Sequence, residues 1–78
     1  MYVPPPLELP TLTLAQARPK VIAVVTHYYA DSMPGTEVEI VKAFEVGNKQ
    51  RVKAFIGINR SGQKLFKQYP LNVLSLKA

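Results

Sequence analysis

Apolar and polar positions alternate along the middle of the chain. Every second residue is apolar in two runs, which are Val38, Ile40, Phe44 and Val46, and then Val52, Ala54, Ile56 and Ile58. A period of two with β-branched and aromatic residues is typical of strands that have one buried face. With a third stretch that ends at Tyr69, residues 36–69 are predicted to form three consecutive strands joined by two short turns.

The first turn decides how the first two of these strands face each other. We expect a three-residue loop, Gly47 to Lys49, because it pairs Phe44 with Val52 and keeps the apolar residues on one face. A two-residue loop at Gly47-Asn48 would instead place Val52 opposite Ala43 and mix the two faces.

One residue conflicts with the alternation in the first strand. Lys42 lies between Ile40 and Phe44, at a position predicted to face inward. A β-bulge at this point, or a lysine that reaches out at a sheet edge, would resolve the conflict.

The second turn runs from Asn59 to Gln63, which pair with each other across a type I turn. Asparagine at the first position and Gly62 at the fourth match the preferences of that turn, and glycine is free to adopt a positive φ there. This register pairs Ile56 with Phe66 and Phe55 with Lys67. A two-residue loop would pair Phe55 with Phe66.

The outward face of these three strands combines cations with large apolar groups. On the preferred register it carries Val41, Arg51, Lys53, Phe55, Leu65, Lys67 and Tyr69. Lysine and arginine hold phosphates, and aromatic rings stack on bases with about 1–3 kcal/mol per base. We therefore predict a nucleic-acid-binding surface made of Lys49, Arg51, Lys53, Phe55, Lys64, Lys67 and Tyr69. The alternative is that leucines from elsewhere in the chain or a second subunit cover the rings, so that the lysines form only a charged rim.

The net charge supports an anionic partner. The chain has 78 residues, enough for one small domain, with a formal charge of +5, and all of its acidic residues lie at or before Glu45. A cationic block on folded strands is typical of proteins that bind nucleic acid, although basic surface also keeps small domains soluble. Cysteine is absent and no apolar run approaches a membrane span or a signal sequence, so we expect no disulfide, no thiolate metal site and no membrane partner. A cytoplasmic or otherwise intracellular, or virion-associated, location is the expectation.

Residues 1–19 are predicted to form an extended arm that precedes a small β-barrel domain at residues 20–78. Pro4, Pro5 and Pro6 favour polyproline II, and Pro19 ends any helical turn between Thr13 and Arg18. Disordered tails are poor in large apolar groups, so the leucines indicate that the arm docks on its own barrel or on a neighbouring subunit. The predicted protein-interaction residues are Leu7, Leu9, Leu12, Leu14, Tyr28 and Tyr29.

Residues 20–29 are predicted to form the longest apolar strand. Val21 to Val25 are apolar at successive positions, which indicates that both faces are covered. The arm or a partner subunit would supply the cover. A strongly coiled strand that gives both faces to one closed core is the alternative.

The order of strands and turns resembles an SH3-like small barrel. The residues that carry this resemblance are Pro34 to Ile40, Arg51 to Ile58, and Tyr69 to Leu74, over roughly residues 34–76. The resemblance implies an all-β fold of about five strands, and the superfamily includes nucleic-acid binders, ribosomal and transcription-factor modules and subunits of larger assemblies. A five-stranded OB-like barrel is the alternative fold.

The sequence offers no catalytic or metal-binding pattern. His27 is the only histidine, and the five carboxylates form no obvious acid–base pair, so neither a zinc site nor a Cys–His pair is expected. The plasmid-borne dihydrofolate reductase family is also a short SH3-like barrel, with a Val-Gln-Ile-Tyr motif in its pore. The most similar segment here is Phe66-Lys67-Gln68-Tyr69, in which glutamine comes one place later and faces the opposite side.

These patterns together predict a binding module that is not an enzyme and needs no cofactor. The expected function is nucleic-acid binding through the outer face of residues 36–69, with homo-oligomers possible. The alternative is a structural subunit of a larger protein complex or virion that docks through its arm and the strand at residues 20–29.

Overall fold

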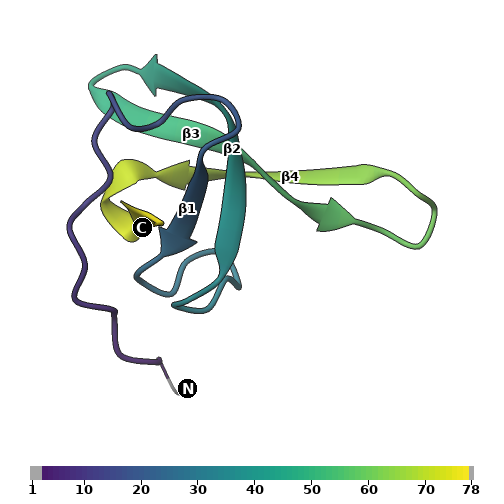
Figure 1. Cartoon of the computed structure of the whole chain (residues 1–78), viewed down its shortest axis with the longest axis horizontal. Coiled ribbons are helices and arrows are strands. Elements are labelled where there is room, and N and C mark those ends of the chain that lie inside the picture. The colour runs from purple at the N-terminus through teal and green to yellow at the C-terminus, as the bar shows by residue number, and fades with distance from the viewer. Residues whose placement is uncertain (1–2, 78) are drawn as a thin grey trace.

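Five antiparallel strands in one sheet form the fold, shown in Figure 1. The computed structural model describes residues 3–77; Met1 and Tyr2 of the predicted arm and Ala78 of the predicted barrel domain lie outside the described residues. The elements are β1 (Ile22–Val25), β2 (Glu37–Val46), β3 (Lys49–Ile58), β4 (Lys64–Pro70), the 3₁₀ turn η1 (Leu71–Val73) and β5 (Leu74–Leu76). The strand order is β4-β3-β2-β1-β5, with β4 and β5 at the two edges. The predicted all-β class with about five strands is confirmed, whereas the sheet is not closed into a barrel.

The first strand is much shorter than predicted. Of residues 20–29, only Ile22–Val25 are in β1, and Ile22 is exposed, so the expectation of a long strand covered on both faces is wrong. The chain leaves the strand because Tyr29 and Ser32 close a tight turn of their own, with two backbone hydrogen bonds between them. Ala30 and Asp31 have φ of 49° and 65° inside this turn. Two consecutive positive φ values are the signature of a type I′ turn.

The turn between β2 and β3 is the two-residue alternative. Val46 pairs with Lys49, and Ala43 pairs with Val52, so the expected three-residue loop is wrong. Gly47 has φ of 62° at the first central position, which glycine adopts without strain and which a type II′ turn requires.

A β-bulge at Val41 then corrects the faces. Ile40 pairs with Ala54 while Lys42 pairs with Lys53, so β2 has one extra residue between them. The bulge keeps Ile40 in the core and turns Lys42 outward, as the bulge hypothesis for this lysine required. It also moves Phe44 to the outer face, where the alternation had placed it inside.

The turn between β3 and β4 forms as expected, but β3 contains a second bulge before it. The amide of Asn59 donates to the carbonyl oxygen of Gln63 at 2.9 Å, and Gly62 has φ of 82°. Phe55 pairs with Phe66, because β3 has an extra residue at Ile56. The predicted pairing of Phe55 with Lys67 is therefore wrong. Phe66 and Gln68 face outward and Tyr69 faces the core, each on the side opposite to the one expected.

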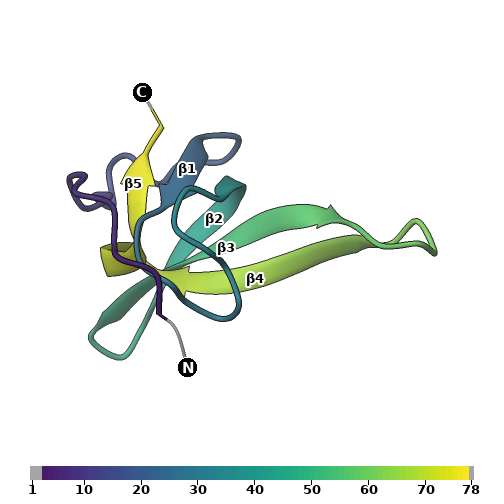
Figure 2. The same cartoon turned by 90° about the horizontal axis from the view of Figure 1, so that it is seen from below.

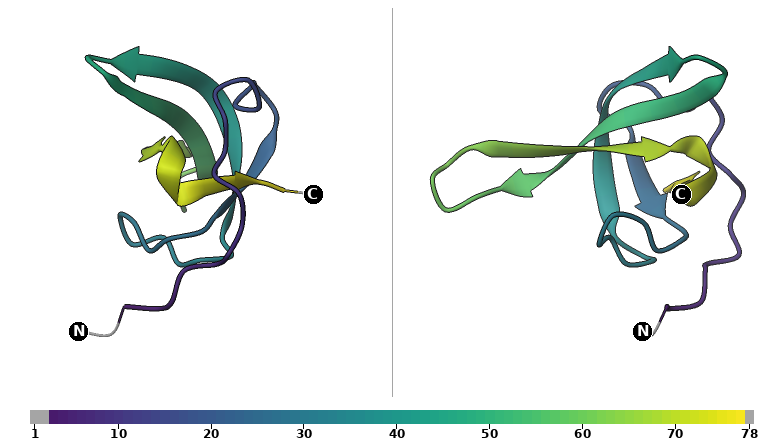
Figure 3. Two further views of the ribbon diagram at one scale, coloured as in Figure 1. Left: turned by 90° about the vertical axis from the view of Figure 1, so that its left-hand side faces the viewer. Right: turned by 180° about the vertical axis from the view of Figure 1, so that it is seen from behind.

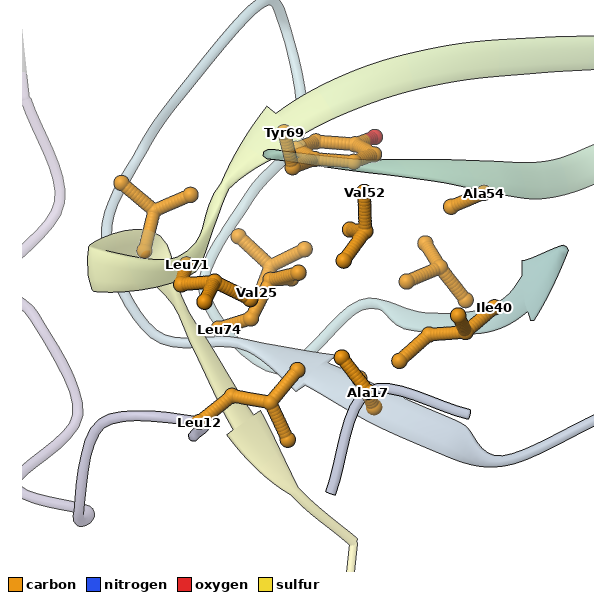
Figure 4. Close-up of a cluster of buried hydrophobic side chains, with 12 residues drawn as sticks. Leu12, Ala17, Val25, Ile40, Val52, Ala54, Tyr69, Leu71 and Leu74 are labelled. Carbon is orange, nitrogen blue, oxygen red and sulfur yellow. The ribbon is translucent and has the colours of Figure 1, made fainter. Parts of the chain in front are cut away.

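The hydrophobic core lies between the curved sheet, η1 and the N-terminal segment, as Figure 4 shows. Its buried members are Leu12, Ala17, Ala23, Val25, Val38, Ile40, Val52, Ala54, Tyr69, Leu71, Val73 and Leu74. Tyr69 is the largest of them and is fully buried. Its hydroxyl lies 2.6 Å from Oγ of Ser32, so the one polar atom of the ring is satisfied inside the protein.

The N-terminal segment packs on its own sheet. It passes alongside β5 (Figures 2 and 3), and the amide of Leu12 donates to the carbonyl oxygen of Leu74 at 2.8 Å. A single turn follows, in which Thr13 and Gln16 exchange side-chain hydrogen bonds with each other's backbone amides. This turn carries Ala17 into the core.

Leucines on this segment should differ sharply in their effect on stability. Leu12→Ala should lower the free energy of unfolding by about 2–5 kcal/mol, because it leaves a cavity beside β5. Leu14→Ala is the matched control, because that side chain is exposed, and it should change stability by no more than about 0.5 kcal/mol. Urea denaturation measures both, and equal effects would contradict the packing of the segment.

The buried hydroxyl pair should show energetic coupling. Tyr69→Phe leaves the Ser32 hydroxyl buried without its partner and should cost about 1–3 kcal/mol. Ser32→Ala in turn leaves the hydroxyl of Tyr69 buried without a hydrogen-bond partner. The double variant should therefore cost less than the sum of the single variants. Strict additivity in a double-mutant cycle would show that the two hydroxyls do not bond.

Candidate nucleic-acid interface

The outer face of β2, β3 and β4 carries charged side chains on neighbouring strands. The strands β3 and β4 continue past β2 as a two-stranded hairpin that projects from the rest of the molecule, as Figures 1 and 3 show. Side chains that face each other across antiparallel strands lie on the same side of the sheet. The register therefore sets out the face in rows, one of which is Lys42, Lys53 and Gln68.

A hollow of about 420 Å³ is centred on this row. Its lining residues are Lys42, Phe44, Lys53, Phe66, Lys67 and Gln68. We call it the lysine hollow. It contains three lysines and two phenylalanines, and no carboxylate of residues 3–77 lines it. Lys42 and Lys53 stand directly opposite each other on neighbouring strands, an arrangement of like charges that destabilises a sheet unless an anion lies between them.

Aromatic contacts hold the centre of the face in place. The rings of Phe55 and Phe66 meet edge to face, with centroids 5.8 Å apart. The ammonium group of Lys53 lies 4.6 Å from the centroid of Phe66, within the range of a cation–π interaction. Phe66 nevertheless keeps 41% of its surface exposed, so its ring is available to a ligand.

A second hollow shares Phe66 with the first. It has a volume of about 400 Å³ and is lined by Glu39, Val41, Phe55, Lys64 and Phe66. We call it the glutamate hollow. Glu39 pairs with Phe55 in the sheet, and Phe55 pairs with Phe66, so these three residues form the row next to the lysines.

Four of the seven residues predicted for nucleic-acid binding line the two hollows of this face. Lys53 and Phe55 project from β3 as expected, Lys64 lines the glutamate hollow, and Lys67 lines the lysine hollow. Tyr69 was expected on the same surface but is fully buried, because the bulge at Ile56 turns it into the core. Lys67 pairs with Ala54 of the core, and its ammonium group donates to the carbonyl oxygen of Ala30.

Arg51 and Lys49 belong to a separate hollow. Arg51 donates from Nη2 to the hydroxyl of Tyr29 at 2.8 Å. Both cations line a cavity of about 530 Å³ with Pro70 and Asn72, away from the row of lysines. The predicted set of cations is therefore divided between two places on the surface. Arg51 faces Phe44 across the sheet, and Glu45 faces Gln50.

The residues predicted for protein interaction also divide into two groups. Leu12 is buried in the chain's own core, and Tyr29 packs on Tyr69 with ring centroids 5.9 Å apart, so neither presents a free surface. The exposed members are Leu7, Leu9, Leu14 and Tyr28. The hydroxyl of Tyr28 donates to Asp31 at 3.0 Å, and this hydrogen bond to a carboxylate raises the pKa of the phenol above its ordinary value.

The alternation pattern missed four residues of the lysine hollow. It assigns Lys42, Phe44, Phe66 and Gln68 to the inner face, and they reach the outer one through the two bulges. The signals for these bulges are a lysine at an inward position and Gly57 in the interior of a strand, where glycine often marks a bulge.

Across residues 3–77 no three His, Cys, Asp or Glu side chains come close enough together to hold a metal ion. Within that range no helix has the length and hydrophobicity to span a bilayer. His27 is exposed, and its Nδ1 lies 2.9 Å from Oγ1 of Thr26.

Comparison of the chain with protein-family models, with curated proteins and with solved structures gave no match.

Proposed function

We propose that the protein is a non-enzymatic module that binds single-stranded nucleic acid on the outer face of β2, β3 and β4. The observation that carries this proposal is the lysine hollow. Lys42 and Lys53 oppose each other there without a carboxylate, and Phe44 and Phe66 border them. Opposed side chains have Cβ atoms about 5 Å apart, so one phosphate group can lie between the two ammonium groups and relieve their repulsion.

The arrangement of rings and cations supports a single strand over a duplex. Successive outward residues of a strand are about 6.8 Å apart, so an aromatic row and the lysine row lie one extended nucleotide from each other. A chain that runs along β3 can place a base against Phe66 and the next phosphate between the lysines. Bases of a duplex are stacked on each other and cannot offer a face to the ring.

The strand connections support an SH3-like variant of the small-barrel fold, with its sheet open. Two hairpins are followed by η1 and a short last strand that pairs with β1, and this order matches the resemblance in the sequence. The OB-like alternative needs a long first strand, which the chain does not have. An intracellular or virion-associated setting and an absence of cofactors remain predictions of this proposal.

Neutral replacements of the two opposed lysines should weaken binding through charge alone. Lys42→Gln with Lys53→Gln keeps the first two methylene groups of each side chain and should lower the affinity for a labelled oligothymidine at low salt by about tenfold or more. The slope of log K against log salt should become shallower by about 0.7, because the one phosphate that the two lysines share is no longer neutralised on a single strand. Fluorescence anisotropy at several salt concentrations measures both quantities. Lys77→Gln is the matched control, because that lysine lies after β5 and is paired with Glu37.

Removal of the exposed ring should act differently. Phe66→Ala should cost about 1–3 kcal/mol of binding free energy with little change in the salt slope, because stacking releases no counterions. An affinity unchanged by either variant, or equally reduced by Lys77→Gln, would contradict the proposed site.

A second candidate function is that of an assembly subunit, which the exposed leucines favour. Leu9 and Leu14 keep 47% and 45% of their surfaces exposed on a segment that is otherwise attached to the sheet. Deletion of residues 1–19 does not test this function, because it removes Leu12 from the core.

Surface substitutions give the cleaner test of assembly. Leu9→Ser with Leu14→Ser should leave the free energy of unfolding unchanged within about 0.5 kcal/mol. If the segment docks on a neighbour, the double variant should lose a higher-mass species that sedimentation of the wild-type protein detects. A wild-type protein that sediments as a monomer at all concentrations would exclude self-assembly through these leucines.

A further inference from the structure

Glu39 is an unusual residue for a face that binds phosphates. Its carboxylate is exposed in the glutamate hollow, beside Phe55 and Phe66 and across from Lys64. Among residues 3–77 no ion pair or side-chain hydrogen bond engages it, whereas Glu37 on the same strand is paired with Lys77. A carboxylate repels the phosphate backbone. Beside two aromatic rings, it suits a ligand with a flat apolar face and hydrogen-bond donors on its edge.

The hollow therefore offers three kinds of contact to one ligand. The rings of Phe55 and Phe66 supply an apolar surface, Glu39 supplies two acceptor oxygens, and Lys64 supplies a donor. Its volume of about 400 Å³ lies within the range of small-molecule sites. Bases of single-stranded nucleic acid are recognised in this way, by stacking on rings and by hydrogen bonds to their Watson–Crick edges.

Guanine is the base whose edge matches this set. Its N1–H and its N2 amino group are adjacent donors that can meet both oxygens of one carboxylate, and its O6 acceptor lies beside them. Cytosine and adenine present one amino group next to an acceptor nitrogen, and thymine or uracil presents one N–H between two carbonyl oxygens. Only guanine gives a carboxylate two parallel hydrogen bonds, the arrangement that makes such pairs strong.

We propose that the glutamate hollow selects a guanine base within a single strand, with Glu39 accepting from N1–H and the N2 amino group and Lys64 donating to O6. This inference rests on the proposed function, since the neighbouring lysine hollow must hold the adjoining phosphate. The base lies against Phe66, which lines both hollows. Glu39 thus supplies selectivity, while Lys42 and Lys53 supply affinity.

Replacement of a single base tests the assignment on the wild-type protein. The probes are labelled thymidine decamers with one central guanine, hypoxanthine, adenine or thymine. Hypoxanthine keeps O6 and N1–H but lacks the N2 amino group, so the guanine strand should bind about tenfold more tightly than the hypoxanthine strand. Strands with adenine or thymine should bind no better than the hypoxanthine strand.

The variant Glu39→Gln should reduce the preference for guanine over hypoxanthine to less than about twofold, because it loses one of the two acceptors. Its affinity for the all-thymine strand should be equal or slightly higher, since a negative charge is removed. Glu37→Gln is the matched control on the same strand and should keep the full preference. Circular dichroism of both variants checks that the fold is unchanged.

The outcomes separate this inference from the function on which it rests. If all four strands bind equally, or a base other than guanine is preferred, guanine selection is wrong while single-strand binding stands. If guanine is preferred but Glu39→Gln keeps that preference, the assignment to Glu39 is wrong. If no strand binds even at low salt, the proposed function itself fails.

Discussion

The bulge at Ile56 is the constraint on which both the core and the candidate site depend. One extra residue on β3 sets the register of β4, so that Tyr69 enters the core while Phe66 and Gln68 face outward. Gly57 follows the bulge with φ of 146°, a conformation that L-residues rarely adopt. A register without this bulge would exchange the two faces of β4. The chain would then expose Tyr69, its largest buried side chain, and bury Phe66, whose ring contacts Lys53.

The open sheet explains why the N-terminal segment is needed. A chain of this size buries a modest share of its surface on folding, about 60%. The sheet is open, so its core needs cover beyond the strands, and Leu12 and Ala17 provide part of it. Leu12 and Tyr29 look like partner contacts when the sequence is read alone. Both pack inside the protein itself, Leu12 in the core and Tyr29 on Tyr69.

The sequence predicts the all-β class, the three central strands and the turn from Asn59 to Gln63 with little error. It also predicts the two faces of the central part of β3, because Val52 and Ala54 alternate there with cations without interruption. It does not predict which way β4 faces. Alternation is a local property, and the two possible registers differ by a single residue whose position depends on tertiary packing. Lys42 and Gly57 mark the two bulges in the sequence. Neither residue predicts which neighbouring side chains change from one face of the sheet to the other.

The strand β3 joins the stability of the fold to the chemistry of its surface. Val52 and Ala54 are fully buried, so the backbone that carries Lys53 and Phe55 is fixed from behind. Lys53 is further restrained by its contact with Phe66, which offsets part of its repulsion from Lys42. A sheet optimised for stability alone would place an acid opposite one of these lysines. The chain has no acidic residue beyond Glu45, and the glutamate on this face stands beside the rings, one row away from the lysines. The outer face thus keeps an unfavourable pair of charges on a rigid support, which is the pattern expected of a surface held ready for an anion.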